Sequence, residues 1–145
     1  MIKKTFKSKE FLMDIANNLF SSAQEARKHA YAPYSGFFVG AAIYADDLNI
    51  YTGCNVENIS FPCGTCAEAG AIAAMISGGA HRILEILIIA DTLQPTTPCG
   101  ACLQRIAEFA NDGTLVHLAN LNGIQKSLPL KDLLPYGFVA EELKK

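Results

Sequence analysis

The sequence has 145 residues, which is long enough for one domain with a full hydrophobic core. Half of the residues are hydrophobic and 18% are charged, a composition that argues against an intrinsically disordered chain. Twelve basic and 14 acidic residues give a net charge of −2, so there is no basic face for a phosphate backbone. We therefore expect a single domain over residues 1–145 and no nucleic acid partner.

The N-terminal residues include several lysines, and charged residues interrupt every apolar stretch there. This pattern fits neither a signal peptide nor a membrane span. Four of the five cysteines lie in two C-x-x-C pairs, which in a chain without an export signal favours metal or redox chemistry over disulfides. We therefore expect a cytoplasmic protein that does not bind membranes.

The pattern of apolar residues, turn residues and helix formers predicts an alternation of helices and strands. In chain order, we expect a helix over 10–30, strands over 37–45 and 49–56, helices over 66–77 and 99–111 with a strand over 83–91 between them, and strands over 113–120 and 123–130. Asp46 and Asp47 form the turn of a predicted hairpin, and Pro98 is expected in the first turn of its helix. This order predicts an α/β fold, a three-layer α-β-α sandwich with a mixed, roughly five-stranded sheet.

The two C-x-x-C pairs, Cys63 with Cys66 and Cys99 with Cys102, suggest a zinc site that is either closed or open. Structural zinc has four protein ligands, whereas catalytic zinc keeps one position for water. The 32 residues between Cys66 and Cys99 exceed the roughly 15–20 of a four-cysteine ribbon. Glu68 stands in the first turn of a predicted helix, where it can reach a zinc-bound water. The pattern C-x-E…P-C-x-x-C is the three-cysteine form of the zinc deaminase signature.

Two other classes of protein stay open at this point. One is a non-catalytic structural-zinc protein that uses Cys63 as a fourth ligand, although such a site needs no acid at Glu68. The other is a thiol–disulfide redox protein whose nucleophile is the first cysteine of a C-x-x-C pair at a helix start. Metal content separates the redox protein from the others.

Five segments, in the same order, resemble the short, homotetrameric type of cytidine deaminase. They are YAPYSGFFVGAA, GCNVENISFP, CAEAGAI, TPCGACLQRIAEF and LLPYGF. The resemblance covers most of the chain and implies a cytidine deaminase-like fold and a homotetramer with shared active sites. It implies zinc-dependent, hydrolytic deamination of cytidine and deoxycytidine to uridine and deoxyuridine, with release of ammonia, for pyrimidine salvage. An alternative substrate is another nucleoside-like aminopyrimidine, such as blasticidin S.

The resemblance also implies a role for each site residue. One Zn²⁺ per chain would be held by Cys66, Cys99 and Cys102, and would make a water reactive near neutral pH. Glu68 would carry the proton of that water to ring N3 of cytosine. The implied substrate-binding residues are Asn55 and Glu57 for the ribose hydroxyls, the Ala67 N–H for the pyrimidine carbonyl, and Phe37 and Phe138 for the base, Phe138 from a neighbouring subunit.

Three positions depart from the family pattern. Ala69 and Leu103 stand where the family usually has arginines, and Phe61 stands where it usually has tyrosine. Three thiolates around Zn²⁺ carry a net charge near −1, which a nearby guanidinium would offset. Arg105 and Arg82 are the candidates for this role at other positions. On this basis Ala69→Arg is expected to raise activity, and no gain would show that the charge is balanced in another way.

The remaining cysteines and histidines lie outside this pattern. Cys54 and Cys63 are expected to be small, partly buried or exposed thiols rather than zinc ligands. His29, His81 and His117 are expected to be surface or strand residues.

Overall fold

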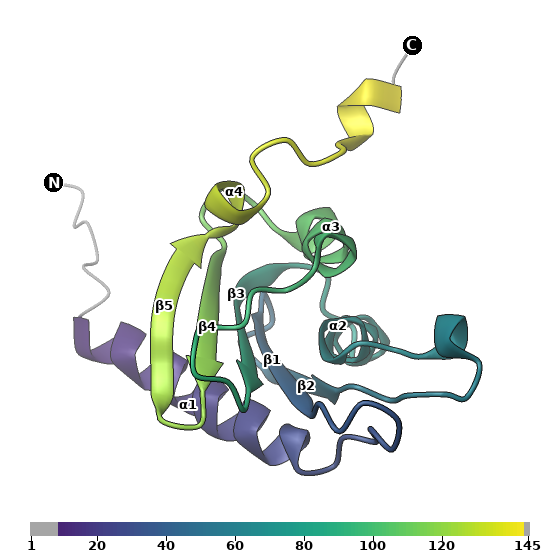
Figure 1. Cartoon of the computed structure of the whole chain (residues 1–145). Helices are drawn as coiled ribbons and strands as arrows, with labels where there is room; N and C mark the ends of the chain where they lie inside the picture. The colour runs from purple at the N-terminus through teal and green to yellow at the C-terminus, as the bar shows by residue number, and fades with distance from the viewer. Residues whose placement is uncertain (1–8, 144–145) are drawn as a thin grey trace, which may run out of the picture.

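A five-stranded mixed sheet forms the middle layer of the structure, a computed structural model that describes residues 9–143 (Figure 1). Its strands are β1 (Val39–Ala45), β2 (Ile50–Cys54), β3 (Ile83–Ala90), β4 (Leu115–Asn120) and β5 (Gly123–Pro129). They lie in the order β2-β1-β3-β4-β5, in which β3 and β4 are parallel and the other neighbours antiparallel. The predicted mixed sheet and its β1–β2 hairpin are therefore confirmed.

Helices cover both faces of this sheet and complete the predicted three-layer sandwich (Figure 1). The helical elements are α1 (Lys9–Arg27), α2 (Ala67–Ser77), α3 (Gly100–Phe109) and α4 (Leu130–Leu133), with short 3₁₀ turns η1 (Phe61–Cys63) and η2 (Ala140–Leu143). Helix α1 packs on one face, and α2 and α3 pack on the other. No helix within the described residues combines the length and the apolar character that crossing a bilayer requires.

The two faces have separate cores because side chains along a strand alternate between faces. On the α1 face, Ile15, Leu19 and Ala23 follow one another at four-residue spacing and pack against strand residues such as Ala42 and Leu87. On the other face, the core consists of residues from α2 and α3 and the alternate positions of the strands. These include Ala67, Ala71, Met75, Ile106, Ala41, Ile43, Ile86 and Ile88.

One glycine on each face lets a helix approach the sheet closely. A Cβ atom on Gly40 of β1 would lie 2.1 Å from the backbone oxygen of Ala23 in α1. A Cβ atom on Gly53 of β2 would lie 2.3 Å from the backbone nitrogen of Ala71 in α2. Both distances are far below van der Waals contact, so only glycine permits this packing.

The strand directions place the starts of two helices on the same side of the sheet, at the carboxyl ends of β2 and β3; this side is called the site edge. Strands β2 and β3 run in the same direction, since each is antiparallel to β1, and β4 is parallel to β3. The chain leaves β2 and β3 at one edge and enters α2 and α3 there. This is the edge of an open α/β sheet at which binding sites usually form.

Some helix boundaries differ from their predicted positions. Helix α1 ends at Arg27 rather than at residue 30, because Lys28, His29 and Ala30 make backbone hydrogen bonds three residues back instead of four. Pro98 lies one residue before the N-cap of α3, so it precedes the first turn rather than belonging to it.

Candidate metal centre and active site

The beginnings of α2 and α3 bring together three of the residues singled out in the sequence. Cys66 is the N-cap of α2, Glu68 lies in its first turn, and Cys102 lies in the first turn of α3. The Cys66 and Cys102 sulfur atoms are 2.8 Å apart. These two sulfur atoms and a Glu68 carboxylate oxygen all lie within 4.8 Å of one another. The fold therefore brings two cysteines that are 36 residues apart in the sequence into direct contact.

The electrostatics of this cluster favour a thiolate at Cys66. The Cys102 S–H donates to the Cys66 sulfur and lowers the pKa of the Cys66 thiol to about 6, an effect that burial opposes. For the same reason the pKa of the Cys102 thiol is raised, since its proton is held by Cys66. The positive ends of two helix dipoles at this edge favour anionic sulfur further.

Cys99, the third predicted ligand, is not among the residues whose ligand atoms lie within 4.8 Å of one another. It is the exposed N-cap of α3, three residues before Cys102. Cys63 lies in η1, is exposed, and its thiol contacts the Ser60 hydroxyl at 3.6 Å. It is not part of the cluster, which disfavours a closed site with Cys63 as fourth ligand.

The donor set of this cluster fits zinc. Thiolates are preferred zinc ligands, and thiolates crowded beside a carboxylate require a cation to offset their charge. Glu68 is only 5% exposed, so its carboxylate is held close to the sulfur atoms rather than dispersed into solvent. The cluster can therefore hold a metal ion with an acid–base group next to it.

Arg105 of α3 also reaches this cluster. Its Nη1 atom lies 4.0 Å from the Cys66 sulfur. Arg82 does not share this position, because its backbone pairs with Asp46 at the turn of the β1–β2 hairpin, where β3 begins. The metal cluster lies beyond the other end of β3.

Asn55 joins the end of β2 to the segment before β1. Its side-chain oxygen accepts a hydrogen bond from the Val39 N–H at 2.8 Å, and its side-chain nitrogen donates to the Phe37 carbonyl at 2.7 Å. The predicted ribose ligand is thus also a structural residue. The amide nitrogen carries a second hydrogen that a sugar hydroxyl could accept.

Glu57, the second predicted ribose ligand, is likewise also a structural residue. Its Oε1 atom accepts hydrogen bonds from the backbone N–H groups of Tyr34 and Ser35, each at 3.0 Å, and its Oε2 atom accepts one from the Ser35 hydroxyl. The Ser35 hydroxyl and these N–H groups lower the pKa of the Glu57 carboxyl. A cavity of about 290 Å³ opens here, lined by Tyr34, Ser35, Glu57, Asn58, Phe61 and Gly64.

The aromatic residues and Ala67 lie as follows. Phe37 and Phe138 are both exposed, while Ala67 is buried at the first position of α2, where its N–H belongs to the helix N-terminus. Phe138 is held by Gln104 of α3, whose side chain accepts from the Phe138 N–H at 3.1 Å and donates to its carbonyl at 2.8 Å. Phe138 is therefore fixed on the surface of its own chain.

The sequence matches a known protein family. A family model described as the zinc-binding region of cytidine and deoxycytidylate deaminases matches residues 13–118. The chain belongs to this deaminase family. A cytidine deaminase of Sporosarcina psychrophila is 43% identical over 131 residues, which cover 90% of this chain and 96% of that protein. One from Halalkalibacterium halodurans is 41% identical, covering 86% of this chain and 95% of that protein.

Solved structures of cytidine deaminases have the same fold. The 1.6 Å crystal structure of the enzyme from Burkholderia pseudomallei matches with a TM-score of 0.80 and 38% identity, covering 84% of this chain and 98% of that chain. The enzyme from Mycobacterium tuberculosis matches with a TM-score of 0.73 and 36% identity, over 85% and 96% of the two chains. The zinc-binding description of the family confirms Zn²⁺ as the cofactor.

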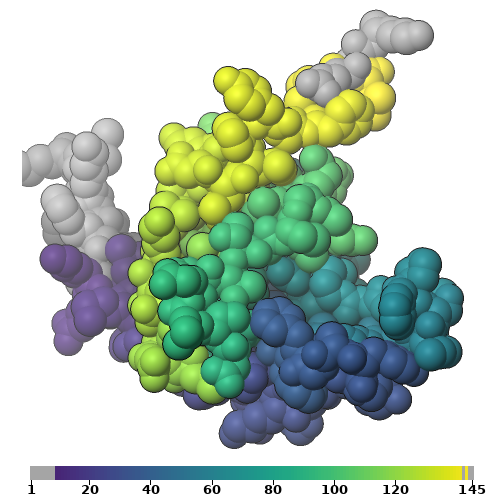
Figure 2. Space-filling model, in the orientation of Figure 1, coloured from purple at the N-terminus to yellow at the C-terminus, as the bar shows by residue number. Residues whose placement is uncertain are grey.

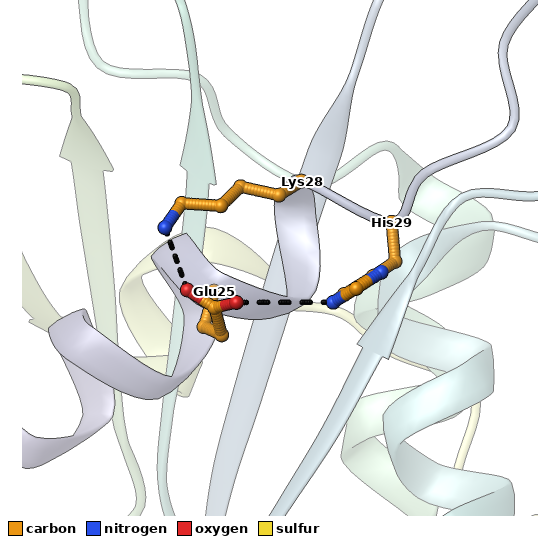
Figure 3. A network of polar contacts seen from close by, with 3 residues as sticks. All are labelled: Glu25, Lys28 and His29. Carbon is orange, nitrogen blue, oxygen red and sulfur yellow. Dashed lines mark hydrogen bonds and ion pairs between the residues drawn. The ribbon is translucent and has the colours of Figure 1, made fainter.

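The histidines of this deaminase lie away from the cluster. His29 and Lys28 both pair with Glu25 at the end of α1, at 3.8 and 2.6 Å (Figure 3). His81 is exposed, and His117 lies in β4 with Glu85 of β3 as its partner.

Sequence reasoning missed the supporting residues Ser35 and Gln104. Their contacts depend on loops folding back, which residue spacing does not show. Pro33 and Gly36, the second of which has a φ of 65°, are the local signals of a turn near Ser35.

Proposed function

We propose that this chain catalyses the hydrolytic deamination of cytidine and deoxycytidine to uridine and deoxyuridine, with release of ammonia, in pyrimidine salvage. The observation that carries the proposal is the cluster of Cys66, Glu68 and Cys102, in which a buried carboxylate lies beside metal-binding sulfur atoms. The cytidine deaminases that share most of the chain support the choice of substrate. The 145 residues would act as a single domain.

The chain's own residues would bind the metal, hold the nucleoside and move the proton. Cys66, Cys99 and Cys102 would hold Zn²⁺, which supplies an activated water near neutral pH. Glu68 would take a proton from this water and deliver it to ring N3, and would then help to protonate the departing amino group. A C4–O bond forms and the C4–N bond breaks, so the products are a uracil ring and ammonia.

Other residues would orient the nucleoside at this edge of the sheet. The Ala67 N–H at the start of α2 would donate to the pyrimidine carbonyl, since helix N-termini present N–H groups without internal partners. Asn55 and Glu57 would bind the ribose hydroxyls from the loop that follows β2. Phe37 would pack against the base.

The test is turnover of cytidine by purified protein of known zinc content. We expect the ultraviolet absorbance of cytidine to change to that of uridine, with one ammonia released per nucleoside and about one zinc per chain. Glu68→Gln should keep the zinc and lose turnover. Bound zinc without turnover of cytidine or deoxycytidine would contradict the proposal. Turnover of blasticidin S alone would show that blasticidin S, rather than cytidine, is the substrate.

We further propose that the active enzyme is a homotetramer with shared active sites, in the cytoplasm. Two segments that project from the body support the assembly (Figure 1). Ile59 and Phe61, in and beside η1, are each 75% exposed, and Tyr136 in the C-terminal segment is 98% exposed. Figure 2 shows this C-terminal segment, in yellow, standing out from the molecule. Such apolar segments are typical of protein interfaces.

The assembly has its own test. Sedimentation of the zinc-loaded protein should give four chains per particle, and Phe138→Ala should raise KM for cytidine if Phe138 enters a neighbouring site. A fully active monomer would contradict this part of the proposal and leave the deaminase activity intact. The location in the cytoplasm is supported by the cysteines, since none of the five, all of which the structure describes, is paired in a disulfide.

A further inference from the structure

We infer that Arg105 is the residue that balances the charge of the metal site. Its guanidinium would hydrogen-bond the Cys66 sulfur and offset the negative charge of the sulfur ligands. Arg105 would thus be a positioning residue, which acts through Cys66 and does not touch the substrate. The inference rests on the proposed function, because it concerns the zinc site of that reaction.

The geometry of α3 places Arg105 where this role requires it. Arg105 follows Cys102 by three residues, a spacing that puts two side chains on the same side of a helix. Cys102 contacts the Cys66 sulfur at 2.8 Å, and Arg105 Nη1 approaches the same sulfur at 4.0 Å. Helix α3 therefore presents a ligand and a cation to one sulfur atom of α2.

The contact between Arg105 and Cys66 would offset the negative charge of the sulfur ligands. The three thiolates and the Zn²⁺ alone, without the Glu68 carboxyl group beside them, sum to a net charge of −1, and one guanidinium offsets that charge. A cation that hydrogen-bonds a ligating sulfur draws electron density from it and keeps the metal a stronger Lewis acid. Among the described residues, no carboxylate forms an ion pair with Arg105, so its charge is not already neutralised by another partner.

Other positions near the ligands do not supply this charge. Leu103, the neighbour of Cys102, is directed into the hydrophobic core between the sheet and the helices. Ala69, in the first turn of α2, has no charged group. Arg82 lies at the far end of β3, where its backbone N–H donates to Asp46. Arg105 is thus the arginine that the fold brings to the ligands.

The experiment compares Arg105→Gln and Arg105→Lys with the unmodified protein, loaded with zinc and, separately, with Co²⁺. We expect Arg105→Gln to retain about one metal ion per chain and to lower kcat for cytidine about 10-fold, with KM nearly unchanged. With Co²⁺, its sulfur-to-metal charge-transfer band should move to longer wavelength, because the sulfur becomes a stronger donor. Arg105→Lys should restore most of kcat. Arg82→Gln is the matched control and should change neither quantity.

A rescue experiment separates charge balance from a packing role. Ala69→Arg introduces a guanidinium from α2 instead of α3. It should raise kcat of Arg105→Gln several-fold and return the charge-transfer band toward its original position. In the unmodified protein the same substitution should change kcat by less than about twofold, because Arg105 already supplies the charge and the two sites are coupled.

Specific results would overturn the inference. Arg105→Gln with an unchanged charge-transfer band and unchanged kcat would show that Arg105 does not act on the ligands. If Ala69→Arg raised kcat equally in the unmodified protein and in Arg105→Gln, this would also show that Arg105 does not act on the ligands. If the unmodified protein did not turn over cytidine, the proposed function would fail, while the band positions of the Co²⁺ proteins would still decide the role of Arg105.

Discussion

Each face of the central sheet carries a cluster of polar side chains, and the two clusters are built in opposite ways. On the α1 face, His117 Nε2 lies 2.8 Å from Glu85 Oε2, and His117 Nδ1 lies 2.6 Å from Ser127 Oγ. On the other face, Cys66 and Cys102 crowd together beside Glu68. The first cluster satisfies itself, since both ring nitrogens of the histidine have partners.

The two clusters show how a buried polar group can be assigned either to structure or to function. Glu85 and His117 are 9% and 4% exposed, and their hydrogen bonds to each other and to Ser127 offset the cost of burial. Thiolates and a carboxylate cannot offset one another, because all carry the same sign of charge. Their cluster is completed only by a cation, and its position at two helix N-termini leaves it open to a ligand.

The largest effect that this comparison predicts is the loss of activity in Glu68→Gln. Activity toward cytidine should fall about 10³-fold or more, because the only proton carrier in the cluster is removed. Zinc content and the melting temperature should stay close to those of the unmodified protein, since glutamine has nearly the same volume. Zinc analysis and thermal unfolding of the same preparation check this. A large drop in melting temperature would assign Glu68 to structure instead.

The two close-packing glycines give the next effect, which should differ between the faces. Gly40→Ala and Gly53→Ala should each lower the free energy of unfolding by about 3 kcal/mol, because the new Cβ overlaps a helix backbone. Gly53→Ala should also lower kcat of the folded protein, since it displaces α2 with its site residues. Gly40→Ala displaces α1 and should leave kcat unchanged. Denaturant unfolding and initial rates at low temperature separate the two effects, and equal losses of kcat would contradict the distinction.

Breaking the Glu85–His117 contact on the α1 face should lower the stability of the fold and leave the reaction rate unchanged. Glu85→Leu leaves the buried His117 ring without its carboxylate partner and should cost about 3 kcal/mol, or about 6–12 °C in melting temperature. The double substitution with His117→Phe should recover much of this loss, because no unpaired polar group then remains buried. The rate constant of the folded enzyme should not change in either protein. A lost rate with unchanged melting temperature would give the α1-face cluster a part in the reaction.

Local patterns in the sequence predicted one of these clusters better than the other. Cys66, Glu68 and Cys102 could be predicted as a group because each lies at a helix start, where cysteine, carboxylate and proline spacing is a local signal. His117 and Glu85 are 32 residues apart on parallel strands, and no spacing rule pairs them. The strand register alone brings them together.

The supporting contacts of the site were also beyond sequence reasoning. Asn55 and Glu57 could be predicted from the resemblance as sugar ligands, but their hydrogen bonds to the 34–39 segment arise only when that loop folds back. The contact between Arg105 and Cys66 depends on how α3 packs against α2. At the hairpin turn, Leu48 adopts a φ of 66°, a conformation for which glycine or asparagine would be expected.

The smallest predicted effect is a change in the pH dependence of stability, and it concerns one carboxyl group at each end of the strands. Asp46, at the edge away from the site, accepts hydrogen bonds from the His81 and Arg82 N–H groups, which lower the pKa of its carboxyl, chiefly through His81. Glu57, at the site edge, has its pKa lowered chiefly by the Ser35 hydroxyl. A lowered folded-state pKa means that the stabilisation is fully present above the unfolded-state pKa of about 4 and is lost as pH falls through the folded-state value.

Asp46→Asn and Glu57→Gln should therefore each reduce the dependence of melting temperature on pH below about 4, without changing its slope between about pH 6 and 8. Only Glu57→Gln should also raise KM for cytidine at pH 7, because its carboxylate holds the 34–35 turn beside the proposed ribose site. Melting curves at several pH values, with KM measured on the same proteins, separate the two effects. A raised KM in Asp46→Asn would show that the edge away from the site also controls binding, since the hairpin and the β2–α2 loop would then move together.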